Sequence, residues 1–356
     1  MTTKRIVYLD AIKVFLTLLV VAHHAGQAYG PTGGVWVIAD PNKVEWLGRF
    51  FFINASYMMG LYFFISGYFV AHSLQTKTAT QFLKDRFLRL GIPLTFFTLC
   101  VFLPFNYLAS GSNENILYFL YTTYFYKPPI AVGHLWFVAS LLVYSFIYLG
   151  LFYFLKETFT TTRSTVFKKR YIVALIIFLT VSGSIVRITF PIDVWRTWLV
   201  PVEVAHIPQY LALFFIGGLC YQYKILACFG VKISFTFLAI AILSLLIQSV
   251  LPPSITTFWL MESFIEALLC VGISMSIISI FRSYCNLENS LVKAISNNMY
   301  GIYLFHLFIV IAFQKLFLTW NISSNIKFIL VTFFSLVVAN IFTQLLKRIE
   351  FLRKVL

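Results

Sequence analysis

Long apolar stretches recur along the whole 356-residue chain, and short polar segments separate them. Most stretches contain about 18 to 25 residues and few charges, which is the length that an α-helix needs to cross a bilayer. The pattern predicts an all-α fold, a transmembrane helix bundle in which residues 1–356 form one membrane domain. We expect about ten spans, at residues 6–28, 49–73, 87–108, 133–155, 171–188, 208–222, 232–250, 258–281, 295–318 and 326–346.

Three segments between these spans have features of their own. Residues 116–126 are apolar but too short to cross, so we interpret them as interfacial or re-entrant; a crossing there would invert every later span. Residues 29–48 and 189–207 are the longest outer segments, and we expect them to shape an outer cleft for an acceptor. Among their glycines and prolines are Gly33, Gly34, Pro191 and Pro201.

The composition excludes a soluble domain, because 60% of the residues are hydrophobic and only 11% are charged. The formal net charge of +15 is compatible with a nucleic-acid partner, but the basic residues cluster between the spans and no nucleic-acid-reading motif accompanies them. With a cytoplasmic N-terminus, 19 of the 27 basic residues fall on the cytoplasmic side, seven fall outside and Lys13 lies within the first span. This excess predicts that both termini face the cytoplasm.

Neither a disulfide framework nor a metal site is expected from the five cysteines, since they form no CxxC pair. A phosphate-binding loop, a GxSxG elbow and an HExxH motif are also missing from the sequence. The first span starts like a signal peptide, but ionisable residues interrupt it and no convincing cleavage site follows. We therefore expect a retained signal-anchor helix.

Ionisable residues are concentrated in the first span, where they are costly and usually face the interior of the bundle. Asp10 and Lys13 are three residues apart on one helical face, so an internal ion pair is the simplest structural explanation for them. Lys13 and His24 are eleven residues apart, which is about three turns and about 16 Å along the same face. A cation at one end can hold a phosphorylated donor, and a neutral imidazole at the other can act as general base. A structural hydrogen bond is the alternative role for the histidine.

The same residues carry a resemblance to a known family. Residues 7–13 (VYLDAIK), followed by residues 19–24 (LVVAHH), resemble the opening of the acyltransferase-3 family, which transfers acyl groups to cell-surface sugars. That family has an Arg, ten residues and then a His. Here Lys13 stands in the Arg position and His24 in the His position, so the spacing and the positive charge are kept but the planar guanidinium is lost.

Further segments resemble motifs of the family in the same order along the chain. They are residues 63–69 (FFISGYF), 82–89 (FLKDRFLR), 133–137 (GHLWF) and 299–306 (MYGIYLFH). Residues 208–218 are also similar to a subgroup with glucan-modifying members. Each motif alone is common in helical membrane proteins, whereas the combination covers nearly the whole length.

The resemblance implies a membrane-bound O-acyltransferase in the cytoplasmic (inner) membrane of a bacterium. Acyl-coenzyme A would be a co-substrate rather than a tightly bound cofactor, with acetyl as the expected acyl group and succinyl as the alternative. The acceptor would be a hydroxyl of a carbohydrate or glycolipid. His24 would be the general base, through direct transfer or an acyl-histidine intermediate, and Lys13, Arg86 and Arg89 would bind the donor. A role as topology anchors also explains Arg86 and Arg89.

Other residues complete the expected site. Glu262 and Glu266, on one face of the eighth span, would support His24 in catalysis; pairing with Arg187 or Arg196 is the alternative. The rival functions are a transporter or flippase for a glycan or lipid-linked sugar and a non-catalytic acyltransferase-like protein. The residues expected to bind substrate or line a tunnel, with interhelical or interfacial packing as the structural alternative, are Asp10, Ser66, His134, Trp136, Tyr303 and His306.

Overall fold

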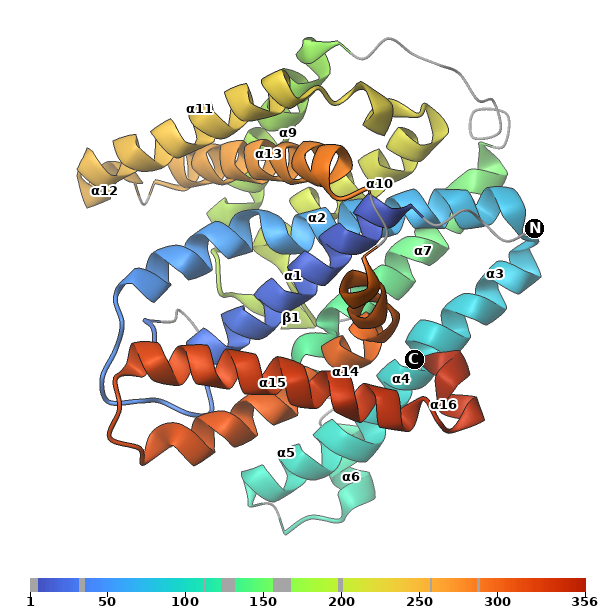
Figure 1. Cartoon of the computed structure of the whole chain (residues 1–356), viewed down its shortest axis with the longest axis vertical. Helices are drawn as coiled ribbons and strands as arrows, with labels where there is room; N and C mark the ends of the chain where they lie inside the picture. The colour runs from blue at the N-terminus through green and yellow to red at the C-terminus, as the bar shows by residue number, and fades with distance from the viewer. Residues whose placement is uncertain are drawn as a thin grey trace.

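The structure is a computed structural model, and it describes residues 6–31, 36–111, 113–122, 132–155, 168–197, 201–256, 258–286 and 289–356. Within these residues, ten helical stretches are long and apolar enough to cross a membrane (Figure 1). The predicted all-α bundle of ten spans is therefore confirmed. The observed spans agree with the predicted ranges to within a few residues, except that the third begins at Ala79 instead of residue 87.

Single helices form nine of the spans, with short 3₁₀ turns leading into two of them. The long helices are α1 (Val7–Gly26), α2 (Trp46–Thr76), α7 (Trp136–Phe154), α9 (Lys169–Thr189), α10 (Ile207–Gln222), α11 (Val231–Val250), α13 (Trp259–Tyr284), α14 (Ser290–Leu318) and α15 (Ser324–Leu346). The shorter helices are α6 (Ile116–Tyr121), η4 (Gly133–Leu135), η5 (Val204–His206), η6 (Ile225–Cys228), α12 (Pro253–Thr256) and α16 (Glu350–Val355). Helix α6 has six residues, too few to cross a bilayer; residues 123–126 of the predicted interfacial segment lie outside the described residues.

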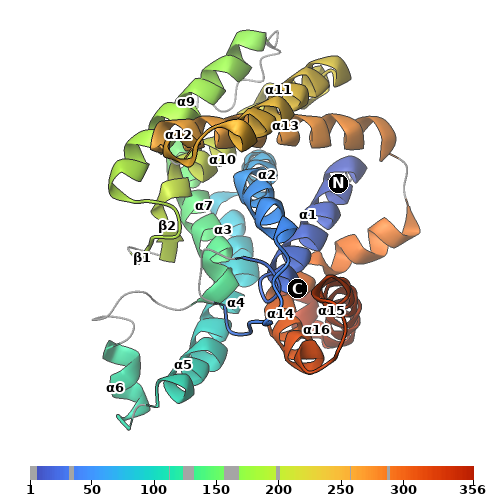
Figure 2. The same cartoon turned by 90° about the vertical axis from the view of Figure 1, so that its left-hand side faces the viewer.

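Helix α1 lies in the interior of the bundle. It packs against α14 and α15 on one side and against α2 and α13 on the other (Figures 1 and 2). Consecutive spans run in opposite directions, so the C-terminal end of α1 and the N-terminal ends of α7, α10 and α13 lie at one end of the bundle. The charge distribution predicts that this end faces outward. We call it the outer end, and the opposite one the inner end.

The backbones of α2 and α10 touch at two glycines. A Cβ on Gly67 would lie 1.8 Å from the carbonyl oxygen of Phe214, and a Cβ on Gly217 would lie 1.9 Å from that of Phe64. No side chain fits at such distances, so both positions require glycine. Lipid supplies no hydrophobic drive between helices, and close contact at small residues is what lets them pack. Gly67, the glycine of the 63–69 motif, therefore has a packing role.

The third span is a composite of α3 (Ala79–Arg86), η1 (Phe87–Gly91), α4 (Ile92–Phe96), η2 (Phe97–Phe102) and α5 (Leu103–Ser110). The segments η1 and η2 are π-helical, and each is followed by a proline, Pro93 or Pro104. Proline has no N–H to continue the ordinary α-helical hydrogen bonds, which accounts for the irregular turns before it. Pro93 in particular cannot donate to the carbonyl of Arg89, four residues earlier. The hydroxyl of Tyr300 in α14 donates to that oxygen, which ties the 82–89 and 299–306 motifs together at the inner end.

The outer segment 36–45, which we call the outer strap, is fixed to the start of α15. Asp40 is only 1% exposed, and its carboxylate accepts hydrogen bonds from Nζ of Lys327 at 2.7 Å and from Oγ of Ser324 at 3.2 Å. Burial raises the pKa of Asp40, but the hydrogen bonds from Lys327, the Asn42 N–H and Ser324, together with the charge of Lys327, bring the pKa below its ordinary value. The strap therefore has a defined position over the outer end.

A two-stranded antiparallel hairpin occupies the second outer segment. Strand β1 (Trp195–Thr197) pairs with β2 (Pro201–Glu203), with Trp195 opposite Glu203. Residues 198–200, like Gly33 and Gly34 of the first outer segment, lie outside the described residues. The all-helical prediction for the spans holds, and this hairpin is an addition that the sequence did not predict.

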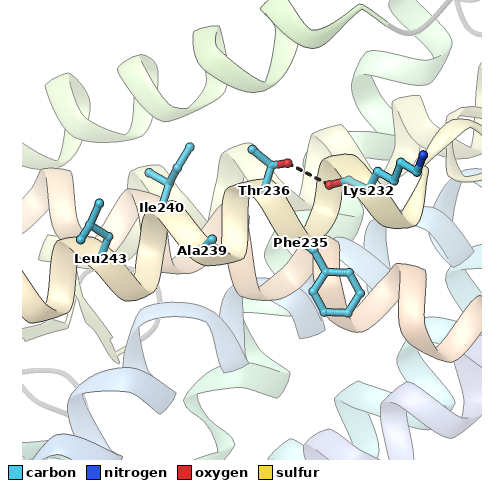
Figure 3. Close-up of a pocket in the computed structure, with 6 residues that line it drawn as sticks. All are labelled: Lys232, Phe235, Thr236, Ala239, Ile240 and Leu243. Atoms are coloured by element: carbon cyan, nitrogen blue, oxygen red, sulfur yellow. Dashed lines mark hydrogen bonds between the residues drawn. The ribbon is translucent and has the colours of Figure 1, made fainter.

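Helix α11 lies at the periphery of the bundle, and Ser234 and Ala241 are its buried residues. A shallow hollow follows it, lined by Lys232, Phe235, Thr236, Ala239, Ile240 and Leu243 (Figure 3). All six residues belong to one helix, and Lys232 is the single ionisable group among them. This hollow has the character of a lipid-facing surface.

Candidate active site

Three histidines from three helical elements meet toward the outer end of the bundle. Nδ1 of His24 in α1 lies 3.1 Å from Nε2 of His306 in α14. The ring of His134, in η4, has its centroid 4.9 Å from that of His306. Tyr303 donates its hydroxyl hydrogen to the carbonyl of His134. The structure thus brings four of the predicted site residues into one group, which we call the histidine cluster: His24, His134, Tyr303 and His306.

The hydrogen-bond partners of this cluster determine where its protons lie. Nδ1 of His306 is 2.6 Å from the carbonyl oxygen of Tyr303, and since a carbonyl only accepts, that nitrogen carries the hydrogen. Nε2 of a neutral His306 is then an acceptor, so the hydrogen between the two rings belongs to Nδ1 of His24. That nitrogen also faces the carbonyl of Val20 at 3.1 Å. Nε2 of His24 is left with the lone pair that a general base needs.

Two further residues hold His24 in place. Trp36 of the outer strap stacks on the imidazole, with ring centroids 5.7 Å apart and an angle of 23° between the planes. Its Nε1 donates to Oε1 of Gln314 at 2.9 Å, and Nε2 of Gln314 donates to the carbonyls of His24 and Ala25, each at 3.0 Å. Carbonyl groups at the end of a helix lack N–H donors from the next turn, and the side-chain amide of the buried Gln314 takes the place of those donors for both carbonyls. The end of α1 and the ring of His24 are therefore both fixed.

His23 points into a different environment from its neighbour. Its ring packs against Phe51 of α2, with centroids 4.9 Å apart. Consecutive residues of a helix differ by about 100° in direction, so the two histidines cannot share one surrounding. Of these two neighbours, His24 contacts the ring of His306, and His23 has no such contact among the described residues.

At the inner end of α1, Lys13 and Asp10 form the ion pair that their spacing predicted. Nζ of Lys13 is 2.6 Å from Oδ1 of Asp10, and it lies 4.6 Å from the centroid of the Phe69 ring. Lys13 remains about a quarter exposed at its side chain, so it retains a path to solvent. The pairing leaves open whether Lys13 also binds a donor.

A line of side chains runs from Lys13 toward the histidine cluster. The hydroxyl of Tyr62 donates to the carbonyl of Lys13 at 3.1 Å and lies 2.6 Å from Oγ1 of Thr17. The ring of Tyr62 contacts that of Phe137, and Phe137 contacts Tyr303 of the cluster. These residues from α1, α2, α7 and α14 connect the two ends of α1 through the interior. Ser66 lies in α2 one turn beyond Tyr62 and next to the glycine contact.

The cations of the third span lie near one more basic residue at the inner end. The guanidinium of Arg86 lies over the ring of Phe82, 5.0 Å from its centroid, and the backbone of Arg89 is held by Tyr300. Nζ of Lys347, just after α15, donates to the carbonyl of Asn297. Burial, and then the positive charge of Arg89, lower the pKa of Lys347. Arg86, Arg89 and Lys347 thus concentrate positive charge at the inner end.

Glu266 lies in a separate ionic cluster at the outer end. Its carboxylate pairs with Arg187 of α9 and lies 3.1 Å from Nε2 of His206 in η5. The other ring nitrogen of His206, Nδ1, is 3.0 Å from Oε2 of Glu203. Nη1 of Arg187 is 3.8 Å from Glu262. Pairing with Arg187, the alternative to a role beside His24, is the arrangement observed, and the described contacts of His24 involve neither glutamate.

The comparison with known families agrees with this geometry. Residues 6–344 match the acyltransferase domain that defines the acyltransferase-3 family, which is nearly the whole chain. The chain belongs to the acyltransferase-3 family. Together with the ten helices that are long and apolar enough to span a membrane, this makes it a multi-pass membrane protein of that family.

Curated relatives of this acyltransferase-3 chain are described as glucans biosynthesis protein C. Those of Salmonella paratyphi B, Salmonella heidelberg and Salmonella enteritidis are each 24% identical to it over 160 residues. The alignment covers 44% of this chain and 41% of each relative, so the chain spans less than half the length of the relatives it matches. No solved structure matches the chain.

Several residues around the acyltransferase-3 site escaped the sequence-based prediction. Trp36 and Gln314, which hold His24, are single polar or aromatic residues without a motif. Tyr300 belongs to the 299–306 motif, and it bonds the Arg89 carbonyl that Pro93 cannot reach with an N–H. The proline was visible in the sequence and could have indicated such a free carbonyl. His206 could have been found as an ionisable residue at the start of a span, which usually faces a partner, as Arg187 was.

Proposed function

We propose that the protein transfers an acyl group from cytosolic acyl-coenzyme A to a hydroxyl of a carbohydrate on the outer side of the membrane, with His24 as the general base. The observation that carries this proposal is the hydrogen bond between His24 and His306. It leaves Nε2 of His24 unprotonated in the interior of the bundle. The cations at the opposite end of the same helix offer a place for the phosphates of the donor.

The chemistry follows from these positions. The acceptor hydroxyl gives its proton to Nε2 of His24 while its oxygen attacks the thioester carbonyl carbon. The carbon–sulfur bond then breaks, and the departing thiolate takes a proton from the imidazolium, so that the free thiol and the ester are the products. His306 stabilises the imidazolium by accepting the Nδ1 hydrogen, in the way that a fixed acceptor supports a catalytic histidine.

For substrates, we propose an acetyl group or, as the alternative, a succinyl group, and a glucan as acceptor. The similarity to proteins named for glucan biosynthesis supports the choice of acceptor. The excess of basic residues in the predicted cytoplasmic segments supports a cytoplasmic donor side. We propose the bacterial cytoplasmic membrane as the location.

The test is acyl transfer by the purified protein in lipid nanodiscs. Acetyl- or succinyl-coenzyme A with a labelled acyl group is incubated with glucan oligosaccharides, and ester formation is measured by mass spectrometry. We expect a labelled ester with the wild type and none above background with His24→Ala. Transport of an unmodified glycan across vesicles without ester formation would instead support the transporter or flippase.

A further inference from the structure

An exposed aromatic corner lies beside the histidine cluster. Trp195 of β1 is 39% exposed, and its ring meets that of Trp136 edge to face, with centroids 5.8 Å apart and planes at 74°. Trp136 follows His134 by two residues, so their Cα atoms are at most about 7 Å apart. The corner thus adjoins the histidine cluster through a short stretch of chain.

The corner is supported from below by stacked rings. Trp136 stacks on Tyr210 of α10, with centroids 5.6 Å apart and an angle of 26°, and Tyr210 stacks on His206 at 5.6 Å and 18°. Aromatic pairs in such offset arrangements stabilise one another beyond the area they bury. Trp136 therefore cannot turn without disturbing the ionic cluster that contains His206.

The hairpin that carries Trp195 is clamped to the same ionic cluster. Glu203, which pairs with Trp195 in the strand register, accepts a hydrogen bond from the backbone N–H of Asp193 at 2.7 Å. Its second oxygen contacts His206, and His206 contacts Glu266. Burial raises the pKa of Glu203, but the charge of His206 and the hydrogen bonds from His206 and the Asp193 N–H together bring it below its ordinary value. The start of β1 is thus tied through Glu203 to the buried charges of His206 and Glu266.

We propose that Trp195 and Trp136 form a stacking platform for a hexose ring of the acceptor glycan, and that Glu203 is the positioning residue that holds the platform. This inference rests on the proposed function and names the part of the protein that recognises its acceptor. The C–H faces of a hexose are apolar and stack on aromatic rings, while its hydroxyls project from the edges. Two indoles at 74° provide a floor and a wall for such a ring, and the adjoining histidine cluster then receives a hydroxyl of the same or the next sugar.

Membrane anchoring alone does not explain this arrangement. Tryptophans at the end of a span commonly anchor a protein in the interface, and Trp320, which is 49% exposed after α14, is an example with the ring of Phe317 as its aromatic contact. Anchoring requires no fixed orientation. Trp195, in contrast, is held against a second tryptophan by a hairpin that is tied to buried charges.

The experiment measures binding and transfer separately. Binding of a linear glucan oligosaccharide to the nanodisc protein is followed by tryptophan fluorescence, and acyl transfer to the same oligosaccharide is followed at varied acceptor concentration. With Trp195→Ala we expect a rise in Kd and acceptor KM of about five- to tenfold, the size expected from the loss of one aromatic stacking contact. The kcat and the donor KM should stay unchanged, and Trp195→Phe should restore most of the affinity.

Trp320→Ala is the matched control, because it removes another exposed tryptophan at the outer end, and it should leave Kd and KM unchanged. Glu203→Ala should raise the acceptor KM like Trp195→Ala, and the double variant should add nothing further if both act through one platform. Equal Kd values for wild type and Trp195→Ala, or no oligosaccharide binding by the wild type, would overturn the platform. Oligosaccharide binding that depends on Trp195 without ester formation would uphold the platform and refute the proposed transfer.

Discussion

Nε2 of His306 accepts the Nδ1 hydrogen of His24, and this relationship across 282 residues of chain leaves Nε2 of His24 unprotonated. It also separates His24 from His23, whose ring packs against Phe51. We predict that His24→Ala lowers kcat for acyl transfer by about 10²-fold or more, which is the usual contribution of a general base. His23→Ala should retain most of the activity. The comparison is made at matched membrane abundance, and activity lost in His23→Ala but kept in His24→Ala would reverse the assignment.

The second prediction separates donor binding from charge pairing at Lys13. The Lys13–Asp10 pair at 2.6 Å explains the lysine structurally, whereas donor binding would need its positive charge for the phosphates. If Lys13 binds the donor, Lys13→Arg should preserve or improve donor use, because guanidinium keeps the charge and adds planar donors, and Lys13→Met should raise the donor KM. Folded yield and donor concentration dependence are measured together. Full recovery of transfer in Asp10→Asn with Lys13→Met would show that Lys13 is only a partner of Asp10.

The third prediction concerns the ion pair that fixes the outer strap. The pKa of Asp40 is lower in the folded protein than its ordinary value, so the carboxylate stabilises the fold above its unfolded pKa of about 3.9. That stabilisation is lost as the pH falls through the folded pKa. Asp40→Asn leaves Lys327 buried without its anion and should cost about 3 to 5 kcal/mol at pH 7. The measurement is thermal unfolding in detergent.

The control for this pair is the double variant Asp40→Asn with Lys327→Met. It leaves no buried charge unpaired, so it should unfold at a higher temperature than Asp40→Asn alone. Its stability should also depend less on pH in the acid range. Equal melting temperatures for wild type and Asp40→Asn would contradict a structural role for the strap.

The fourth prediction tests the orientation of the bundle. The segment 156–170 is expected in the cytoplasm with both termini; residues 156–167 lie outside the described residues, and α9 begins at Lys169. A single cysteine at position 168 should react only with a membrane-permeant reagent in intact cells. Ready labelling by an impermeant reagent would invert the orientation and with it the assignment of donor and acceptor sides.

The fifth prediction concerns the glycine contact between α2 and α10. Gly67→Ala would bring its Cβ to 1.8 Å from a backbone oxygen that no side-chain rotation can move, so we expect little folded protein. Gly150→Ala in α7 is the control, since a Cβ there meets nothing within 4 Å and alanine favours a helix over glycine. Normal yield of Gly67→Ala with full activity would show that the helices separate easily.

The number of spans was predictable, because apolar length is a local property of a sequence. The family resemblance singled out His24 and His306, and their catalytic role stays a prediction. The partners of His24 were not predictable, since Trp36 and Gln314 are brought together across 278 residues by tertiary packing. The partner of Glu266 could not be predicted for the same reason. The sequence placed Glu266 at a depth similar to that of His24, but whether it pairs with His24 or with Arg187 depends on which helices are neighbours. Hairpin β1–β2 was missed because three-residue strands carry no alternating pattern.

The contact of Gly67 and Gly217 with the opposite backbone limits how the protein can move. A slide of α2 along α10 would replace Gly67 by Ser66 or Tyr68 at the contact and drive a Cβ into a carbonyl. Sliding of these two helices past each other is therefore blocked along this line. The proposed transfer fits such a fixed pair of helices, because it requires only the acyl group, and not the whole donor, to reach the outer side.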